Sequence, residues 1–298
     1  MCAKKLVNTR DLSYEEWLAW RRQGIGGSDA GAVYGADKWK TALEVYLDKT
    51  GELPPSEEKE AMKLGSKLKD FIAREFTDRT GHRVMRRNWI FQHPEHSFML
   101  AGLDRWVIGS HAGLLCKSTG EFSKEEWENG RVPAKIDFQC QHYMAVTGAD
   151  HWWVAVLIGG NKFRTVRLER SEERIKRLID REAVFWNEHV LRRRPPSFDG
   201  TDASSDLLNR LYPPPTSRNS SVRLTEEAEG WIGQYRQGAE EERAATLRKT
   251  EAENKLKGLL GEHEQGTVGN YKVEWKSINR KSDRFTPYRR FQISTISK

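Results

Sequence analysis

The chain has 298 residues, of which 37% are hydrophobic and 31% charged, and its net charge is +7. This length fits one large domain or two smaller ones, and thirty aromatic residues are enough for a packed core, which excludes wholesale disorder. No stretch reaches the ~18 consecutive apolar residues that a membrane span needs. The beginning of the sequence lacks the apolar run of a secretory signal, and three widely spaced cysteines do not suggest a disulfide scaffold. We expect a cytoplasmic protein without membrane contact.

Helix signals dominate the first 80 residues. Capping-box patterns begin two predicted helices, at Ser13 and at Thr41, and Gly24 and Gly51 end them. A third helix is predicted over residues 57–80, after a Pro-Pro break and before a glycine.

Short apolar or alternating segments then predict a sheet with helices between its strands. In chain order we expect strands at 83–91, 98–103 and 113–117, a helix at 133–147, a hairpin of strands 151–158 and 162–168, and a helix at 171–194. This order predicts a mixed α/β or α+β domain, with a central sheet flanked by helices.

The composition changes after residue 200. A linker is predicted over 201–221, clearest at the Pro-rich and Ser-rich segment 212–221. A long charged helix over 225–260 and a small basic β element follow. The predicted organisation is therefore a core over 1–200, a linker over 201–221 and a C-terminal region over 222–298.

The last 28 residues carry +6 of the net charge, because eight basic residues face two acidic ones. Interleaved aromatic residues suit a nucleic-acid surface that neutralises phosphates and stacks bases. The alternative is a solvated basic hairpin whose aromatic stripe faces a core. The candidate DNA-binding residues are Lys272, Lys276, Arg280, Lys281, Arg284, Arg289 and Arg290.

A glycine-rich segment, GIGGSDAG, occupies residues 24–31. Glycines before Ser28, which can N-cap a helix, would form a pocket of backbone amides suited to phosphate. Arg21 and Arg22 lie just upstream and can add guanidinium donors. The alternative is a tight turn between two helices.

A second group of candidate catalytic residues lies at the ends of two predicted strands. Asp104 ends one predicted strand and Lys117 ends another, so a carboxylate and an ammonium can meet at one point. The carboxylate can ligate Mg²⁺, and the lysine can orient or deprotonate a water. Gln139 and Tyr143 share a helix face nearby in sequence. The alternative is a turn aspartate beside an ordinary strand-end charge.

Taken in order, the segments RRQGIGGSDAG, HPEHSFMLAGLD, QCQHYMAVTG, AVLIGGNKF and PPSFDG resemble the YqaJ family over roughly residues 14–200. This family groups viral-type recombinases, relatives of bacteriophage lambda exonuclease within the PD-(D/E)XK nuclease superfamily. The resemblance implies a restriction-endonuclease-like core with helices on both sides of the sheet. It implies 5′-to-3′ digestion of one strand of linear duplex DNA with Mg²⁺ or Mn²⁺, leaving a 3′ single strand for an annealing protein. It also implies a homo-oligomer, since members that resemble lambda exonuclease can form ring-shaped trimers around DNA.

The resemblance assigns roles to particular residues. Asp104 would be the metal-binding aspartate, Lys117 the catalytic lysine and Gln139 the glutamine of the active-site helix. Ser28, with Arg21 or Arg22, would hold the 5′-terminal phosphate.

Two positions depart from the family's pattern. The E-x-K motif expects Glu two residues before Lys117, where this chain has Leu115, either by replacement or by deletion of a neighbouring Glu. The upstream helix expects Glu four residues after Gly65, where this chain has Lys69. Because Mg²⁺ relies on carboxylates, metal binding should be weakened, and Asp104 could form a salt-bridge cluster with the lysines instead. Asp70 and Glu121 are the first places to look for a substitute carboxylate.

Three functions remain open at this point. The chain is an active metal-dependent exonuclease, a catalytically impaired DNA-binding member of the family, or a helical module that uses residues 225–260 as a partner surface.

Overall fold

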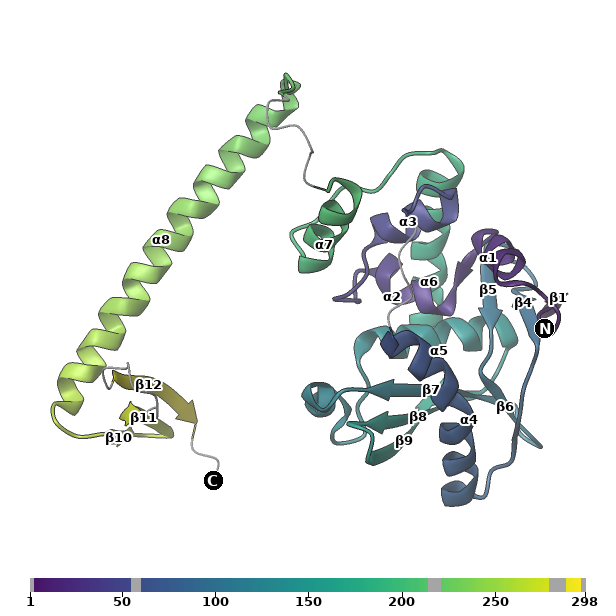
Figure 1. The fold of residues 1–298 in the computed structure, drawn as a ribbon, viewed down its shortest axis with the longest axis horizontal. Helices are drawn as coiled ribbons and strands as arrows, with labels where there is room; N and C mark the ends of the chain where they lie inside the picture. Colours follow the sequence, from purple (N-terminus) through teal and green to yellow (C-terminus); the bar gives the residue numbers. More distant parts are fainter. Residues whose placement is uncertain (1–2, 55–59, 214–220, 279–287, 296–298) are drawn as a thin grey trace. The chain divides into compact units, whose positions relative to one another are not determined.

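The computed structural model describes residues 3–54, 60–213, 221–278 and 288–295 (Figure 1). It divides into two compact units, Met1–Thr216 and Ser217–Lys298. Within the described ranges, no helix is both long and apolar enough to cross a bilayer.

The first unit contains two sheets. The smaller has the strand order β1-β4-β5-β2, in which β2 runs parallel to β5 and the other pairs are antiparallel. Its strands are β1 (Lys4–Asn8), β2 (Ile25–Gly26), β4 (Trp89–Gln92) and β5 (Met99–Gly102).

The larger sheet has the order β3-β6-β7-β8-β9 and is antiparallel except between β7 and β8. The parallel pair keeps one register along its length, and a 3-10 helix, η1 (Glu121–Trp127), and helix α5 (Ala134–Thr147) connect its strands. The strands are β3 (Val84–Met85), β6 (Arg105–Val107), β7 (Ala112–Thr119), β8 (His151–Ile158) and β9 (Lys162–Glu169).

Helices cover both faces of the larger sheet. On one face, Ile72 and Phe76 of α4 (Glu60–Thr80) pack on Leu114 and Cys116 of β7. On the other face, the buried side of α5 joins Leu115 in a second core cluster. A third cluster forms among α2 (Gly27–Tyr34), α3 (Ala42–Thr50), the π-helical segment η2 (Phe185–Leu191) and α7 (Asp202–Leu211). Helix α6 (Glu172–Val184), which η2 continues, contributes Ile175 to the cluster of α5, and α1 (Tyr14–Arg22) has no fully buried side chain.

The predicted fold class is confirmed, with two differences in the arrangement. The strands form two sheets rather than one central sheet, because the chain turns at Leu103 and Asp104 between β5 and β6. Part of the predicted linker 201–221 is helical. Thr201 caps α7, and Leu207 is fully buried in the third cluster, so these residues pack on the core.

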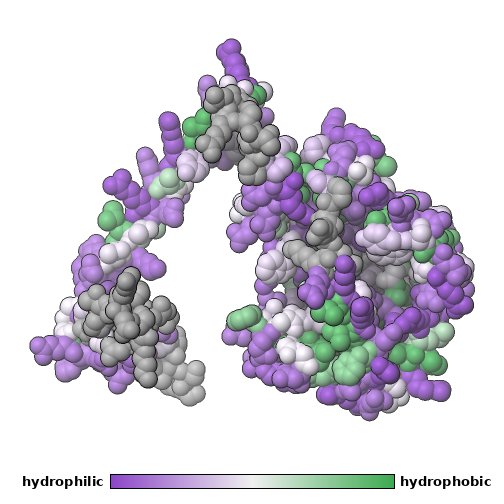
Figure 2. Space-filling view, viewed as in Figure 1, coloured by the Kyte–Doolittle hydropathy of each residue, from purple (hydrophilic) through white to green (hydrophobic). Residues whose placement is uncertain are grey.

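The second unit consists of one long helix and a small antiparallel sheet. Helix α8 (Glu227–Leu260) is exposed along most of its length, and Figure 2 shows mainly hydrophilic side chains on it. The sheet has the order β10-β11-β12, with β10 (Gln265–Val268), β11 (Tyr271–Ile278) and β12 (Tyr288–Thr295). The candidate DNA-binding residues Arg280, Lys281 and Arg284 lie outside the described residues.

Candidate active site

One cavity of about 240 Å³ in the first unit gathers most of the site residues that were predicted within residues 1–200. They come from the turn between β5 and β6, from β7, and from helices α1, α2, α4 and α5. The predicted residues in its lining are Arg21, Ser28, Lys69, Asp104, Leu115, Lys117 and Gln139.

Asp104 lines this cavity at the point where the chain passes from β5 into β6. Its side chain is 12% exposed, and both carboxylate oxygens have partners. Oδ2 accepts a hydrogen bond from the backbone N–H of Cys116 at 3.0 Å. Oδ1 lies 2.7 Å from Nζ of Lys69, whose side chain is 41% exposed. Of the two lysines expected around Asp104, Lys69 forms an ion pair with it.

Lys117 reaches the same cavity from β7. Strand side chains alternate, so Leu115 and Lys117 share one face, and both line the cavity. Burial lowers the pKa of Lys117, and the carboxylate of Asp104 opposes that effect. Leu115 is only 2% exposed and belongs to the core beneath the cavity. The strand continues beyond Lys117 to Thr119, two residues further than predicted.

Helix α5 supplies the wall opposite β7. Pro133 precedes its first turn, and Gly148 ends it in the left-handed conformation, as the sequence predicted. Gln139 and Tyr143 lie one turn apart, and the Gln139 amide donates a hydrogen bond to the Tyr143 hydroxyl at 2.8 Å. Burial raises the pKa of Tyr143, so this hydroxyl stays protonated near neutral pH.

The glycine-rich segment forms the remaining wall at the start of α2. The structure corrects one expectation here, because Gly26 rather than Ser28 is the N-cap residue. Gly27 has to be a glycine, since a Cβ atom at this position would lie 2.4 Å from Cε1 of Tyr143. Ser28 lies in the first turn and accepts a hydrogen bond from Nη2 of Arg21 at 3.3 Å. Backbone amides, a hydroxyl and a guanidinium therefore converge on this side of the cavity.

A buried charge cluster that the sequence did not predict lies behind this wall. Asp29 is completely buried, with Nζ of Lys49 at 2.7 Å, Nζ of Lys40 at 2.8 Å and Nη2 of Arg21 at 3.7 Å. Burial by itself raises the pKa of Asp29, but these positive charges outweigh it and hold the pKa well below its usual value. The Asp29 carboxylate also accepts a hydrogen bond from the N–H of Gly26, which fixes the entry to α2. The only indication of this cluster in the sequence is that an aspartate follows three residues after Gly26, the glycine that caps α2.

Two other candidates do not line this cavity. Arg22 faces Asp48 at 3.9 Å. Asp70, considered as a substitute metal ligand, lines a neighbouring cavity with Lys69 and Asp104, but it is hydrogen-bonded to Arg86 and Arg105. The Arg86 guanidinium lowers the pKa of Asp70, which keeps this carboxylate ionised and paired.

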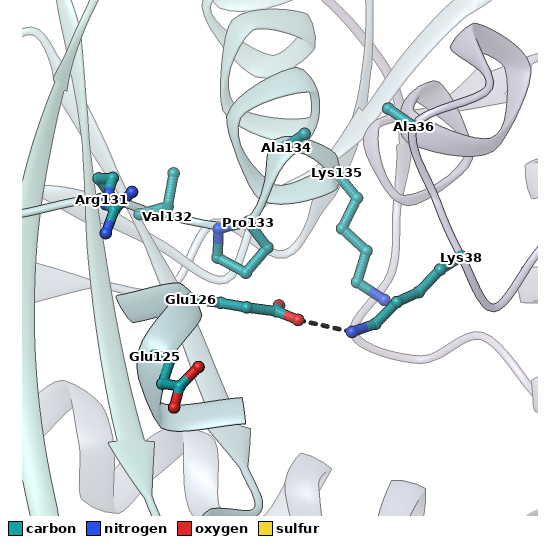
Figure 3. A pocket seen from close by; sticks show the side chains of 9 residues that line it. All are labelled: Ala36, Lys38, Glu125, Glu126, Arg131, Val132, Pro133, Ala134 and Lys135. Atoms are coloured by element: carbon teal, nitrogen blue, oxygen red, sulfur yellow. Dashed lines mark hydrogen bonds and ion pairs between the residues drawn. The ribbon is translucent and has the colours of Figure 1, made fainter. Parts of the chain in front are cut away.

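The acidic residues that follow β7 also point elsewhere. Glu121 pairs with Lys162 at the start of β9. Glu125 and Glu126 line a different cavity between η1 and the start of α5, where Glu126 faces Lys38 (Figure 3). Oε1 of Glu126 lies 2.5 Å from Nζ of Lys38. None of these three carboxylates lines the cavity that contains Asp104.

The donor set around Asp104 does not fit a divalent metal ion. Mg²⁺ and Mn²⁺ need several oxygen ligands, usually with carboxylates among them. Across the described parts of the chain, no group of three or more His, Cys, Asp and Glu side chains is placed to hold a metal. At Asp104 itself, the ammonium of Lys69 lies against one carboxylate oxygen, and an aliphatic side chain stands at position 115.

Solved structures confirm the fold class. The alkaline exonuclease from Laribacter hongkongensis aligns with a TM-score of 0.50 at 20% identity, over 60% of this chain and 97% of that one. A structure of that exonuclease in complex with dAMP aligns with a TM-score of 0.50 at 22% identity, over 58% of this chain and 91% of that one.

Sequence comparison identifies the family. Residues 16–150 match the YqaJ-like viral recombinase domain. An uncharacterized protein of Bacillus subtilis (strain 168), YqaJ, is 38% identical over 315 aligned positions, which cover 99% of this chain and 98% of that protein. The chain therefore belongs to the family of YqaJ-like viral recombinases.

Proposed function

We propose that this chain binds the 5′-phosphorylated ends of linear duplex DNA and hydrolyses DNA weakly or not at all. The observation that carries the proposal is the contact between Lys69 and Asp104 at 2.7 Å, in a cavity that also contains Lys117 and an apolar Leu115. These residues retain cationic donors for a phosphate, but Asp104 is the one carboxylate among them, whereas a hydrolytic metal centre requires several oxygen ligands.

The phosphate-binding side of the cavity supports end recognition. Arg21 and Ser28 offer a guanidinium and a hydroxyl, and the first turn of α2 offers backbone N–H groups beside them. A terminal phosphate dianion presents more charge and more acceptor oxygens than an internal phosphodiester, so such a set of donors favours chain ends. The buried Asp29 cluster holds this wall in place.

Active exonuclease function is the second candidate. It is favoured by the presence of both Asp104 and Lys117 in one cavity, the pair that the family resemblance assigns to catalysis. In that case the chain would digest linear duplex DNA from 5′ to 3′ with Mg²⁺ or Mn²⁺, and leave a 3′ strand for a single-strand annealing protein. It would need carboxylate ligands from residues that do not line this cavity.

Two measurements on the full chain separate these functions. Binding is compared between 5′-phosphorylated linear duplex, the same duplex without phosphate, and a covalently closed circle. We expect the phosphorylated linear duplex to bind most tightly, and equal binding to all three would contradict end recognition. Digestion of the linear duplex is then followed with Mg²⁺ or Mn²⁺. Rapid digestion that Asp104→Ala abolishes would favour the second candidate.

A further inference from the structure

The ammonium of Lys69 occupies the position beside Asp104 where a cation is expected. Lys69 projects from α4, whose Leu68 and Ile72 pack on the face of β7 opposite to the one that lines the cavity, and its ammonium reaches Asp104 in the lining. The Asp104 side chain is 12% exposed and the Lys69 side chain is 41% exposed, and both residues line the cavity.

An ammonium can connect a carboxylate to a phosphate. It carries three N–H donors, and the contact with Oδ1 of Asp104 uses one of them. The remaining donors of Lys69 can point toward phosphate oxygens in the cavity. This arrangement reproduces the electrostatic part of a bridging metal ion, although it cannot activate a water as a metal does.

The formal charges of the cavity lead to the same conclusion. Asp104 contributes one negative charge, and Arg21, Lys69 and Lys117 contribute three positive charges, so the lining carries a net charge of +2. With Glu at positions 69 and 115, the same lining would carry −1, and the three carboxylates would repel a DNA phosphate until divalent cations were bound. The unmodified chain does not face that repulsion.

We infer that Lys69 replaces the divalent cation beside Asp104, so that this chain holds a DNA 5′ end without any divalent metal. The inference rests on the proposed end-binding function and adds its independence from metal. Lys69 acts here as a binding residue, and the negative charge of Asp104 positions its ammonium.

The test measures binding of a fluorescent 5′-phosphorylated duplex in EDTA, in Mg²⁺ and in Ca²⁺, at matched ionic strength because phosphate binding depends on salt. For the unmodified chain we expect dissociation constants that agree within about twofold across the three conditions. For Lys69→Glu we expect binding in EDTA to weaken by about tenfold or more, since a charge-assisted hydrogen bond to the phosphate is removed and a repulsion is added. Added Ca²⁺ should restore much of that affinity.

Lys67→Glu is the matched control. It lies on the same helix, is exposed, does not line the cavity, and changes the net charge by the same amount. Lys67→Glu should weaken DNA binding less than Lys69→Glu does, and Ca²⁺ should not restore the affinity that Lys67→Glu loses. Lys69→Met provides a second variant that adds no carboxylate. It should weaken binding in EDTA without any recovery in Ca²⁺, and thermal unfolding checks that each variant is folded.

The outcomes separate the two proposals. If the unmodified chain shows no preference for phosphorylated ends, the proposed function fails. If it prefers such ends but needs Mg²⁺ or Ca²⁺ to bind them, only the role of Lys69 is overturned. Equal decreases in affinity for Lys67→Glu and Lys69→Glu, with no effect of Ca²⁺ on either, would also overturn it.

Discussion

Nη2 of Arg21 donates a hydrogen bond to Oγ of Ser28 across 3.3 Å, and this contact joins the last turn of α1 to the first turn of α2. The Arg21 guanidinium also lies over the ring of Trp17, 4.8 Å from its centroid, which limits the positions that it can adopt. The sequence left Arg21 and Arg22 as equal candidates for phosphate binding, and the geometry favours Arg21.

This difference makes Arg22 the control for a first prediction. We expect Arg21→Ala or Ser28→Ala to reduce the preference for a 5′-phosphorylated end over an unphosphorylated one by about tenfold, because each removes part of a charge-assisted donor set for the terminal phosphate. Arg22→Ala removes the same charge outside the cavity and should leave that preference unchanged. Competition binding with the two duplexes measures it. Equal effects of Arg21→Ala and Arg22→Ala would contradict the assignment.

Local signals explain which elements the sequence predicted well. Pro133 and Gly148 bound α5 as expected, because a proline suits the start of a helix and a glycine its left-handed end. The hairpin of β8 and β9 turns at Gly159 and Gly160, both with positive φ. These features depend on neighbouring residues, so a single sequence is enough to indicate them.

Long-range contacts explain what the sequence did not predict. The buried partners of Asp29 come from positions 11 and 20 residues further along the chain, and no local pattern links them. The division into two sheets depends on how the chain turns at Leu103 and Asp104. The sequence of the strand before this turn does not indicate that one sheet ends there and another begins. By contrast, the cluster of Asp104 with Lys69 was expected, but only because the family resemblance placed the two positions together.

A second prediction concerns the C-terminal unit. A chain shortened to residues 1–216 should remain folded, because these residues form a compact unit of their own. Its affinity for duplex or single-stranded DNA should fall, and the salt dependence of binding should flatten by about 0.9 in log–log slope for each phosphate that is no longer neutralised. A chain shortened to residues 1–260 keeps α8 and removes only the basic β element. If neither truncation changes the slope, the second unit has another role, such as binding a partner protein.

A third prediction concerns the turn between β4 and β5. Nδ1 of His93 accepts hydrogen bonds from the backbone N–H groups of Glu95 at 3.1 Å and His96 at 3.0 Å, which only an unprotonated nitrogen can do. Burial, with a smaller effect from His96, lowers the pKa of His93 from 6.5 to about 4. Between these two pKa values the unfolded chain binds more protons, so this group makes the free energy of unfolding decrease as pH falls from about 6.5 to about 4.

His93→Asn tests this prediction, because an amide oxygen can accept the same hydrogen bonds without titrating. Urea unfolding at pH 7 and at pH 5 should show a smaller decrease in stability for His93→Asn than for the unmodified chain. The same decrease in both proteins would mean that His93 does not contribute to the pH dependence.

The last prediction restores the missing carboxylates. Leu115 is 2% exposed and shares a strand face with Lys117, so a Glu at this position would point into the cavity that contains Asp104. Leu115→Glu alone should lower the free energy of unfolding by about 2 kcal/mol or more, since a carboxylate replaces a packed aliphatic side chain. Mn²⁺ should recover part of that stability, because the metal would bind the folded state alone.

Adding Lys69→Glu to this variant should raise both the recovery by Mn²⁺ and the digestion of linear duplex DNA. The effects of the two substitutions should be non-additive in a double-mutant cycle, because both carboxylates would bind the same metal centre. Leu115→Gln is the matched control, since it adds a polar side chain of similar size without the charge, and it should restore neither property. Asp104→Ala in the double variant should abolish both gains.

The proposal of an impaired site is wrong if the unmodified chain already digests linear duplex rapidly with Mg²⁺ and Asp104→Ala abolishes that activity. Asp70 would then have to leave Arg86 and Arg105 to act as a ligand.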